Sequence, residues 1–177
     1  MSSEDIRCCE YFLLPGYIYL NTEPALLSTV LGTNVAVSLW DPQKKFGGMA
    51  NYLYPVTKTR VTATAQYGNV AIRFLIKMFL DEGANQHDLK AQIFGGADKS
   101  AGICARIARE NIQMARKILR GARIEVVSED LGGSMGRKIV YNTFKNEAIV
   151  YKVSDLRSSD WYPYEPGCER EKVRKSV

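Results

Sequence analysis

Cysteine and histidine are the residue types that most readily do covalent or metal chemistry, and both are sparse in this chain. The cysteines are Cys8, Cys9, Cys104 and Cys168, and the single histidine is His87. A thiolate beside an imidazole makes a nucleophile, whereas clustered cysteine and histidine bind zinc. The spacing fits no zinc pattern and contains no C-x-x-C, and adjacent Cys8 and Cys9 are poorly placed to bridge each other. We therefore expect free thiols in a reducing compartment, with no metal and no organic cofactor.

Three glycine-rich stretches also stand out, at residues 31–37, 93–97 and 131–138. Glycines in or beside strands mark tight turns, bulges or close backbone approach. None of the three is a phosphate loop, because the chain has neither G-x-x-x-x-G-K-[ST] nor a G-x-G-x-x-G that opens a helix. Taken singly, these glycines indicate backbone geometry rather than nucleotide binding.

The elements that must position such residues begin with strands. Residues 12–20 predict a short strand broken by Pro15-Gly16. Residues 29–40 predict a strand covered on both faces, because both of its alternating sets of side chains are mostly apolar. A turn at 41–44 then leads into a returning strand over 46–54.

Two later segments repeat apolar residues every three or four positions, which predicts amphipathic helices over 66–80 and about 101–120. The apolar stripe expected in the second helix is Ile103, Ile107, Met114, Ile118 and Leu119. Short strands are expected at 89–94, 123–127, 138–144 and 147–153. This order predicts an α/β (α+β) fold, a layered sandwich of mixed β-sheets with two main amphipathic helices.

The length of 177 residues fits one domain. We expect a flexible N-terminus over 1–11, a folded domain over 12–153, and a loosely attached or disordered tail over 154–177, where apolar patterning fades. The net charge of +5 is scattered rather than clustered, so nucleic-acid binding is not expected. No signal peptide or membrane-length apolar run is found, which predicts a cytoplasmic protein without membrane insertion.

Together and in order, the glycine-rich stretches resemble the chemoreceptor glutamine deamidases, the CheD family. The family pattern L-G-S-C-V-A-V-x-L-Y-D-P is similar to L-G-T-N-V-A-V-S-L-W-D-P at 31–42, and G-G-x-A-H-x-x-L-P to G-G-M-A-N-Y-L-Y-P at 47–55. F-G-G-A is matched at 94–97, and D-x-G-G-x-x-G-R-K-V is similar to D-L-G-G-S-M-G-R-K-I at 130–139. A looser I-A-R-E-N at 107–111 resembles the family's I-G-x-R-N.

The resemblance covers residues 12 to about 153, with Leu14-Pro15-Gly16 similar to the family's opening. It implies conversion of receptor glutamines to glutamates and, in some members, hydrolysis of methyl esters. A cysteine thiolate attacks the side-chain carbonyl, ammonia leaves and water resolves the thioester. A histidine moves the protons, and a hydroxyl residue six positions before the cysteine completes the family's site.

This chain departs from the family at the two reactive positions. Asn34 stands at the cysteine position, Asn51 at the histidine position and Ser28 at the hydroxyl position. An amide donates and accepts hydrogen bonds but is neither a nucleophile nor a base at pH 7. Because the lost pair acts as a unit, nearly all covalent catalysis should be lost with it. We therefore expect a vestigial site.

Neither His87 nor Cys104 is expected to replace the lost pair, since the first is predicted to be a solvated loop residue and the second a buried structural thiol. The leading hypothesis is a non-catalytic module that binds chemoreceptor helices, or a CheC-type phosphatase presenting a receptor-like helix. The residues expected to shape its binding groove are Thr33, Gly95, Gly96, Gly132, Gly133 and Arg137.

Three alternatives remain open. The chain is a working deamidase or methylesterase that relies on Ser28, or its unused site has simply decayed. For Arg137 and Lys138, the alternative to groove formation is a tight turn with a solvated Arg-Lys pair.

Overall fold

The computed structural model describes residues 9–99 and 101–161. In chain order its elements are β1 (Cys9–Phe12), β2 (Tyr17–Asn21), β3 (Ala25–Leu31), β4 (Val35–Asp41), β5 (Phe46–Tyr52), α1 (Gly68–Asp81), the 3₁₀ turn η1 (Gln86–Asp88), β6 (Lys90–Gly95), α2 (Ile103–Gly121), β7 (Glu125–Leu131), β8 (Gly136–Asn142), β9 (Glu147–Val153) and α3 (Ser158–Trp161). Within this described part of the chain, no helix is long and apolar enough to cross a membrane.

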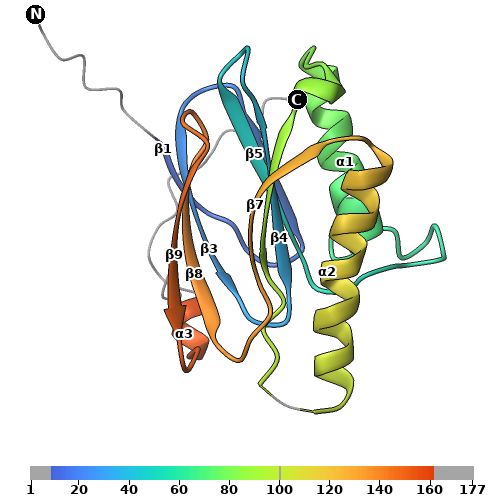
Figure 1. The fold of residues 1–177 in the computed structure, drawn as a ribbon, viewed down its shortest axis with the longest axis vertical. Coiled ribbons are helices and arrows are strands. Elements are labelled where there is room, and N and C mark those ends of the chain that lie inside the picture. Colours follow the sequence, from blue (N-terminus) through green and yellow to red (C-terminus); the bar gives the residue numbers. More distant parts are fainter. Residues whose placement is uncertain (1–8, 100, 162–177) are drawn as a thin grey trace, which may run out of the picture.

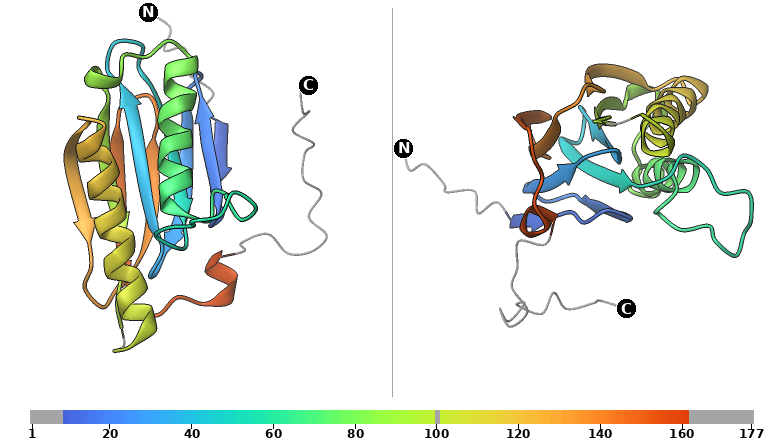
Figure 2. Two further views of the ribbon diagram at one scale, coloured as in Figure 1. Left: turned by 90° about the vertical axis from the view of Figure 1, so that its right-hand side faces the viewer. Right: turned by 90° about the horizontal axis from the view of Figure 1, so that it is seen from below.

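The strands form two mixed sheets that pack face to face. One has the order β1-β3-β8-β9 and the other β2-β5-β4-β6-β7. Helices α1 and α2 lie side by side over the outer face of the five-stranded sheet (Figures 1 and 2). The predicted layered sandwich with two main helices is confirmed.

Each interface between layers has its own apolar core. The larger lies between the helices and the five-stranded sheet, and the smaller between the two sheets. Strand β4 contributes to both, since Val37 and Leu39 belong to the helical core and Ala36 to the inter-sheet core. Burial on both faces explains why this strand is mostly apolar, as predicted.

The predicted strand over 29–40 is two strands, because residues 32–34 turn the chain from one sheet into the other. Strand β3 lies in the four-stranded sheet and β4 in the five-stranded sheet. The turn is closed by the Gly32 N–H, which donates to Asn34 Oδ1 at 2.8 Å. Asn34, the residue expected at the family's cysteine position, therefore lies where the chain crosses between the sheets.

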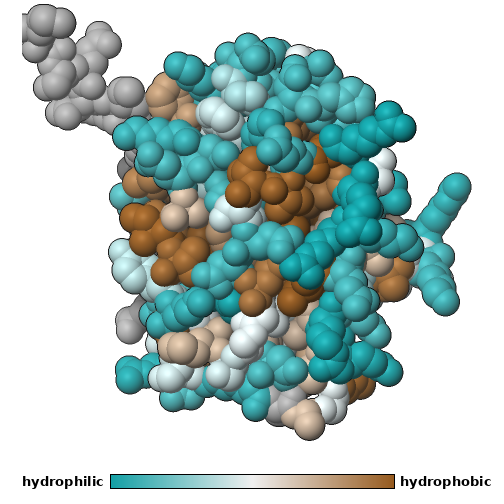
Figure 3. Space-filling model, in the orientation of Figure 1, coloured by the Kyte–Doolittle hydropathy of each residue, from teal (hydrophilic) through white to brown (hydrophobic). Residues whose placement is uncertain are grey.

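Strand β7 is also longer than the predicted 123–127. It pairs parallel with β6 as far as Gly95↔Leu131. As an edge strand it exposes polar side chains such as Ser128 and Glu129, so its second half has no apolar alternation to detect. Apolar side chains are exposed on two edge strands, one from each sheet. Val127 on β7 is 46% exposed and Ile149 on β9 is 54% exposed. Figure 3 shows the resulting hydrophobic surface on this side of the molecule.

Two predictions for α2 are wrong. Ile103 is 65% exposed and Cys104 is exposed, although the first was expected in the apolar stripe and the second in the core. The first turn of α2 projects beyond the end of the sheet (Figure 1), so nothing lies beneath it to bury these side chains.

The ordered structure extends past both expected domain ends. Strand β1 begins at Cys9, where it pairs parallel with Ala25 of β3, and α3 lies within the stretch expected to be a loose tail. Residues 1–8 and 162–177 lie outside the described residues. Within residues 154–161, ion pairs join Asp155 to Lys99 and Asp160 to Lys138.

Candidate functional site

Asn34 and Asn51 meet between the two sheets. The Asn34 Nδ2 atom donates to Asn51 Oδ1 at 2.7 Å across a sequence separation of 17 residues. The β4–β5 hairpin brings them together, since Ala36 of β4 pairs with Asn51 of β5. Their exposed fractions are 1% and 0%. The structure thus joins the two residues that were expected at the family's cysteine and histidine positions.

The Asn34 amide is also bonded on its other sides. Its Oδ1 accepts from the Gly32 N–H at 2.8 Å, and its Nδ2 makes a second, longer bond of 3.3 Å to the Val30 carbonyl. Buried polar groups need such partners, because an unpaired amide away from water costs free energy. The side chain is therefore built into the turn.

Thr29, which the sequence did not single out, supplies the hydroxyl of the site. Asn51 Nδ2 donates to Thr29 Oγ1 at 2.9 Å, and this hydroxyl donates to the Leu13 carbonyl at 2.7 Å. Thr29 pairs with the core residue Ile139, whereas Ser28 pairs with Val140. Neighbouring side chains on a strand point to opposite faces, so Ser28 faces away from Asn51. The expectation that Ser28 completes the site is corrected to Thr29.

The F-G-G-A loop holds the backbone of the Asn34 turn. The Gly96 N–H donates to the Asn34 carbonyl at 2.9 Å, and the Ala97 N–H to the Gly32 carbonyl at 2.7 Å. Gly95 has φ 106°, and a Cβ there would lie 2.3 Å from the Asn34 carbonyl oxygen. A side chain cannot occupy that space. Gly95 and Gly96 lie beside Asn34. Because Gly95 has no side chain, the backbone of this loop can approach the backbone of the Asn34 turn closely.

Gly132 and Gly133 extend the same arrangement. The Gly132 N–H donates to the Gly95 carbonyl at 2.9 Å, and the Gly133 carbonyl accepts from the Asp98 N–H at 2.7 Å. Both glycines have φ 70° with open space on the side where a Cβ would stand. The loop after β7 is therefore tied to the loop after β6.

Arg137 supports this loop from inside the protein. It is 2% exposed, lies 2.7 Å from an Asp130 carboxylate oxygen, and donates to the Gly132 and Met135 carbonyls at 2.8 and 3.1 Å. A buried guanidinium needs such partners to offset its lost hydration. The alternative of a solvated Arg-Lys pair is therefore wrong for Arg137, while its part in shaping a binding groove stays a prediction.

Asn111 on α2 is a positioning residue that the sequence reasoning missed. Its Nδ2 donates to the Thr33 carbonyl at 3.0 Å and to the Leu53 carbonyl at 2.9 Å. One fully buried amide thus holds the residue before Asn34 and a residue just after Asn51. The available signal was the I-A-R-E-N motif, which ends at Asn111.

Tyr52 follows Asn51 but faces the helices, where its hydroxyl donates to the Asn111 carbonyl at 2.6 Å. Burial raises the pKa of Tyr52 far above its ordinary value, because the phenolate would lose its hydration. The phenol therefore stays neutral and cannot serve as a base at physiological pH.

Neither residue considered as a replacement joins the pair. His87 is exposed in η1, as predicted, next to the end of β6 that pairs with Trp40. The other end of β6 pairs with Val35, beside Asn34, so His87 lies at the opposite end of the sheet. Hydroxyl, amide and carbonyl groups surround the amide pair, and none of them is a base at neutral pH.

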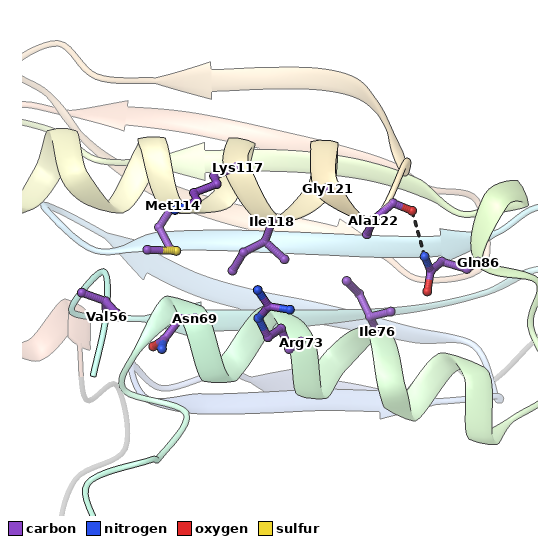
Figure 4. Close-up of a pocket in the computed structure, with 10 residues that line it drawn as sticks. All are labelled: Val56, Asn69, Arg73, Ile76, Gln86, Met114, Lys117, Ile118, Gly121 and Ala122. Carbon is purple, nitrogen blue, oxygen red and sulfur yellow. Dashed lines mark hydrogen bonds between the residues drawn. The ribbon is translucent and has the colours of Figure 1, made fainter. Parts of the chain in front are cut away.

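A separate groove of about 680 Å³ runs between α1 and α2. Arg73 and Ile76 of α1 point toward Met114 and Ile118 of α2, and the Gln86 amide bonds the Ala122 carbonyl at one end (Figure 4). The groove lies on the helical face, and neither Asn34 nor Asn51 lines it. It therefore does not give access to the amide pair.

Comparisons with known proteins agree with this fold. The sequence model of a family described as CheD chemotactic sensory transduction matches residues 55–152, a range that begins after Asn51 and includes Asn111. The chain is 40% identical over 143 residues to a probable chemoreceptor glutamine deamidase CheD of Trichlorobacter lovleyi, covering 80% of this chain and 89% of that protein. It is 36% identical over 143 residues to CheD 1 of Anaeromyxobacter dehalogenans, covering 80% and 83%. A relative from Sulfurimonas denitrificans is 38% identical over 131 residues, covering 72% and 84%. The chain belongs to the CheD family of chemotaxis proteins.

Proposed function

We propose that this protein is a binding member of the CheD family that recognises chemoreceptor helices without deamidating them. The observation that carries the proposal is the hydrogen bond between Asn34 and Asn51 at the two reactive positions. A thiol and an imidazole placed there would exchange a proton and form a nucleophile. Two amides only donate to and accept from each other.

The retained support of the site favours binding over decay. Asn111 still holds Thr33 and Leu53, and the Asn34 carbonyl still accepts from the loop that contains Gly95 and Gly96. Thr29 keeps a hydroxyl within hydrogen-bond distance of Asn51. These contacts fix the shape of the surface around the turn, which supports a binding role that needs no covalent chemistry.

The class of partner comes from the relatives, which are named chemoreceptor glutamine deamidases. A receptor helix is therefore the first partner to test. A CheC-type phosphatase that presents a receptor-like helix is the second candidate, and the +5 charge of the chain suits an acidic surface on either one.

The direct test uses calorimetry to measure binding of the purified protein to the cytoplasmic helices of chemoreceptors from the same organism. The matched variants are Thr33→Arg, which places a bulky charge on the half-buried Asn34 turn, and Gln113→Arg on the exposed face of α2. Binding that is lost in the first variant and kept in the second supports the proposal. A protein that binds no receptor helix contradicts it.

The alternative is an active deamidase or methylesterase. It requires a nucleophile other than Asn34, and Ser28 was its candidate. Ser28 pairs with Val140, and its side chain lies on the face opposite the amide pair. This position does not support Ser28 as the nucleophile.

A further inference from the structure

The C-terminal segment 155–161 packs against the turn that carries Asn34. Two glycines leave room for its apolar side chains. A Cβ on Gly136 would lie 2.7 Å from Leu156 Cδ1, and a Cβ on Gly32 would lie 3.6 Å from the Trp161 ring. Gly32 and Gly136 flank the paired residues Leu31 and Arg137 of β3 and β8, so both glycines belong to one surface.

The Trp161 ring lies close to the amide pair. The same Cβ position on Gly32 that approaches the ring is 3.9 Å from Asn34 Oδ1, and the Gly32 N–H donates to that oxygen. Figure 1 shows α3 at the end of the four-stranded sheet where β3 leads into β4. The ring therefore lies against Gly32, two residues before Asn34.

Two ion pairs fix the segment at either end. Asp155 lies 2.8 Å from Lys99, and Asp160 lies 2.6 Å from Lys138. Asp160 also accepts from the Arg157 N–H at 2.8 Å, which closes the single turn of α3. The surface thus contributes two lysines and two glycines, and the segment supplies two carboxylates, a leucine and a tryptophan.

A helix of four residues does not hold its shape unaided, because nucleating the first turn is unfavourable. The form of α3 therefore depends on its docking. The Asp155–Lys99 pair is exposed and the Asp160–Lys138 pair is only partly buried, and ion pairs near the surface add little. A segment held by so few contacts opens at low cost compared with the core.

We propose that the surface formed by Gly32, Gly136, Lys99 and Lys138 is a docking site for a short acidic helical segment with a bulky apolar side chain. The chain's own segment 155–161 occupies it as an intramolecular ligand, and a partner helix of the same chemistry displaces it. This proposal rests on the proposed function for the identity of that partner, since the docking surface adjoins Asn34.

The first experiment needs no receptor. Amide signals of Gly32 and Gly136 are followed by NMR in the full chain and in two variants, Trp161→Ala and the exposed control Ser159→Ala. We expect shifts at both glycines in the first variant and none in the second. A synthetic peptide of residues 154–161 added to the Trp161→Ala chain is expected to move both signals back. A peptide with the same residues in scrambled order should not do so.

Unchanged glycine signals in Trp161→Ala, or no response to the native peptide, would overturn the docking site whatever the receptor does. The second experiment titrates receptor helices against both variants. If the segment closes the site for most of the time, its release raises receptor affinity about three- to tenfold. Equal or weaker binding by Trp161→Ala would overturn displacement by the receptor. If none of the chains binds a receptor, displacement and the proposed function both fail, and the peptide response alone decides whether the surface accepts a helix.

Discussion

The Asn111 amide joins the two halves of the candidate site, because it donates to the carbonyl of Thr33 on one side and to that of Leu53 on the other. Asn34 and Asn51 owe their 2.7 Å contact to this kind of backbone support as well as to their own side chains. Substitutions of the supporting residues should therefore weaken the contact between Asn34 and Asn51 and lower the free energy of unfolding.

Replacement of Asn111 by alanine should destabilise the protein by about 2–3 kcal/mol, because two partly buried carbonyls lose their donor. Urea denaturation measures this loss. Gln113→Ala, on the exposed face of the same helix, controls for helix propensity and should stay within about 0.5 kcal/mol of the natural protein. Equal effects of the two changes would show that the Asn111 contacts contribute nothing.

Asn51→Ala should cost about 1–3 kcal/mol, since it leaves the Asn34 Nδ2 donor with one long bond and removes a donor from Thr29. The control is Asn85→Ala, which removes an exposed amide that accepts only from the His87 N–H. Thermal and urea unfolding of both variants would test the difference. A loss at Asn85 as large as that at Asn51 would contradict the account of a buried polar network.

Two glycine-to-alanine changes should have opposite effects. Gly95→Ala meets the Asn34 carbonyl and has φ 106°, so it should lower the free energy of unfolding by more than about 1 kcal/mol. Gly121→Ala, at the end of α2 with open space around it, should raise that free energy by about 0.4–1 kcal/mol. Unfolding midpoints of the two variants that move in the same direction would contradict this assignment.

Docking of segment 155–161 should weaken in acid. The hydrogen bond from Lys138 lowers the pKa of Asp160 below its ordinary value, and Lys99 does the same for the pKa of Asp155. A carboxyl whose pKa is lower when docked stabilises docking above its ordinary pKa of about 4, and that contribution disappears as the pH falls through the lowered value.

NMR signals of Gly32 and Gly136 should therefore move toward their Trp161→Ala positions below about pH 4. The Asp160→Asn variant should show less of this pH dependence, because one of the two titrating groups is gone. A pH profile that is identical in the natural protein and in Asp160→Asn would exclude Asp160 as its cause.

The layers could be predicted from the sequence, but the contacts that support the candidate site could not. Periodicity identified both helices, and a hairpin brings together Asn34 and Asn51, the two residues that the resemblance singled out. Thr29 was missed because the face of a β3 side chain depends on where β3 ends, and the break at residues 32–34 was not predicted. Arg137 was misjudged because its partner Asp130 lies across a loop, and only the folded chain buries the guanidinium beside that carboxylate. Helix α3 is too short and polar to show any periodicity.

The most direct test of the central claim is mass spectrometry of receptor helices incubated with the natural protein and with the Asn34→Cys, Asn51→His double variant. The account predicts that the natural protein leaves every receptor glutamine intact. The double variant should convert some of them to glutamate, because the retained supporting contacts place a thiol beside an imidazole. Conversion of receptor glutamines by the natural protein would contradict the account, since the protein would then catalyse deamidation without a cysteine or histidine at positions 34 and 51.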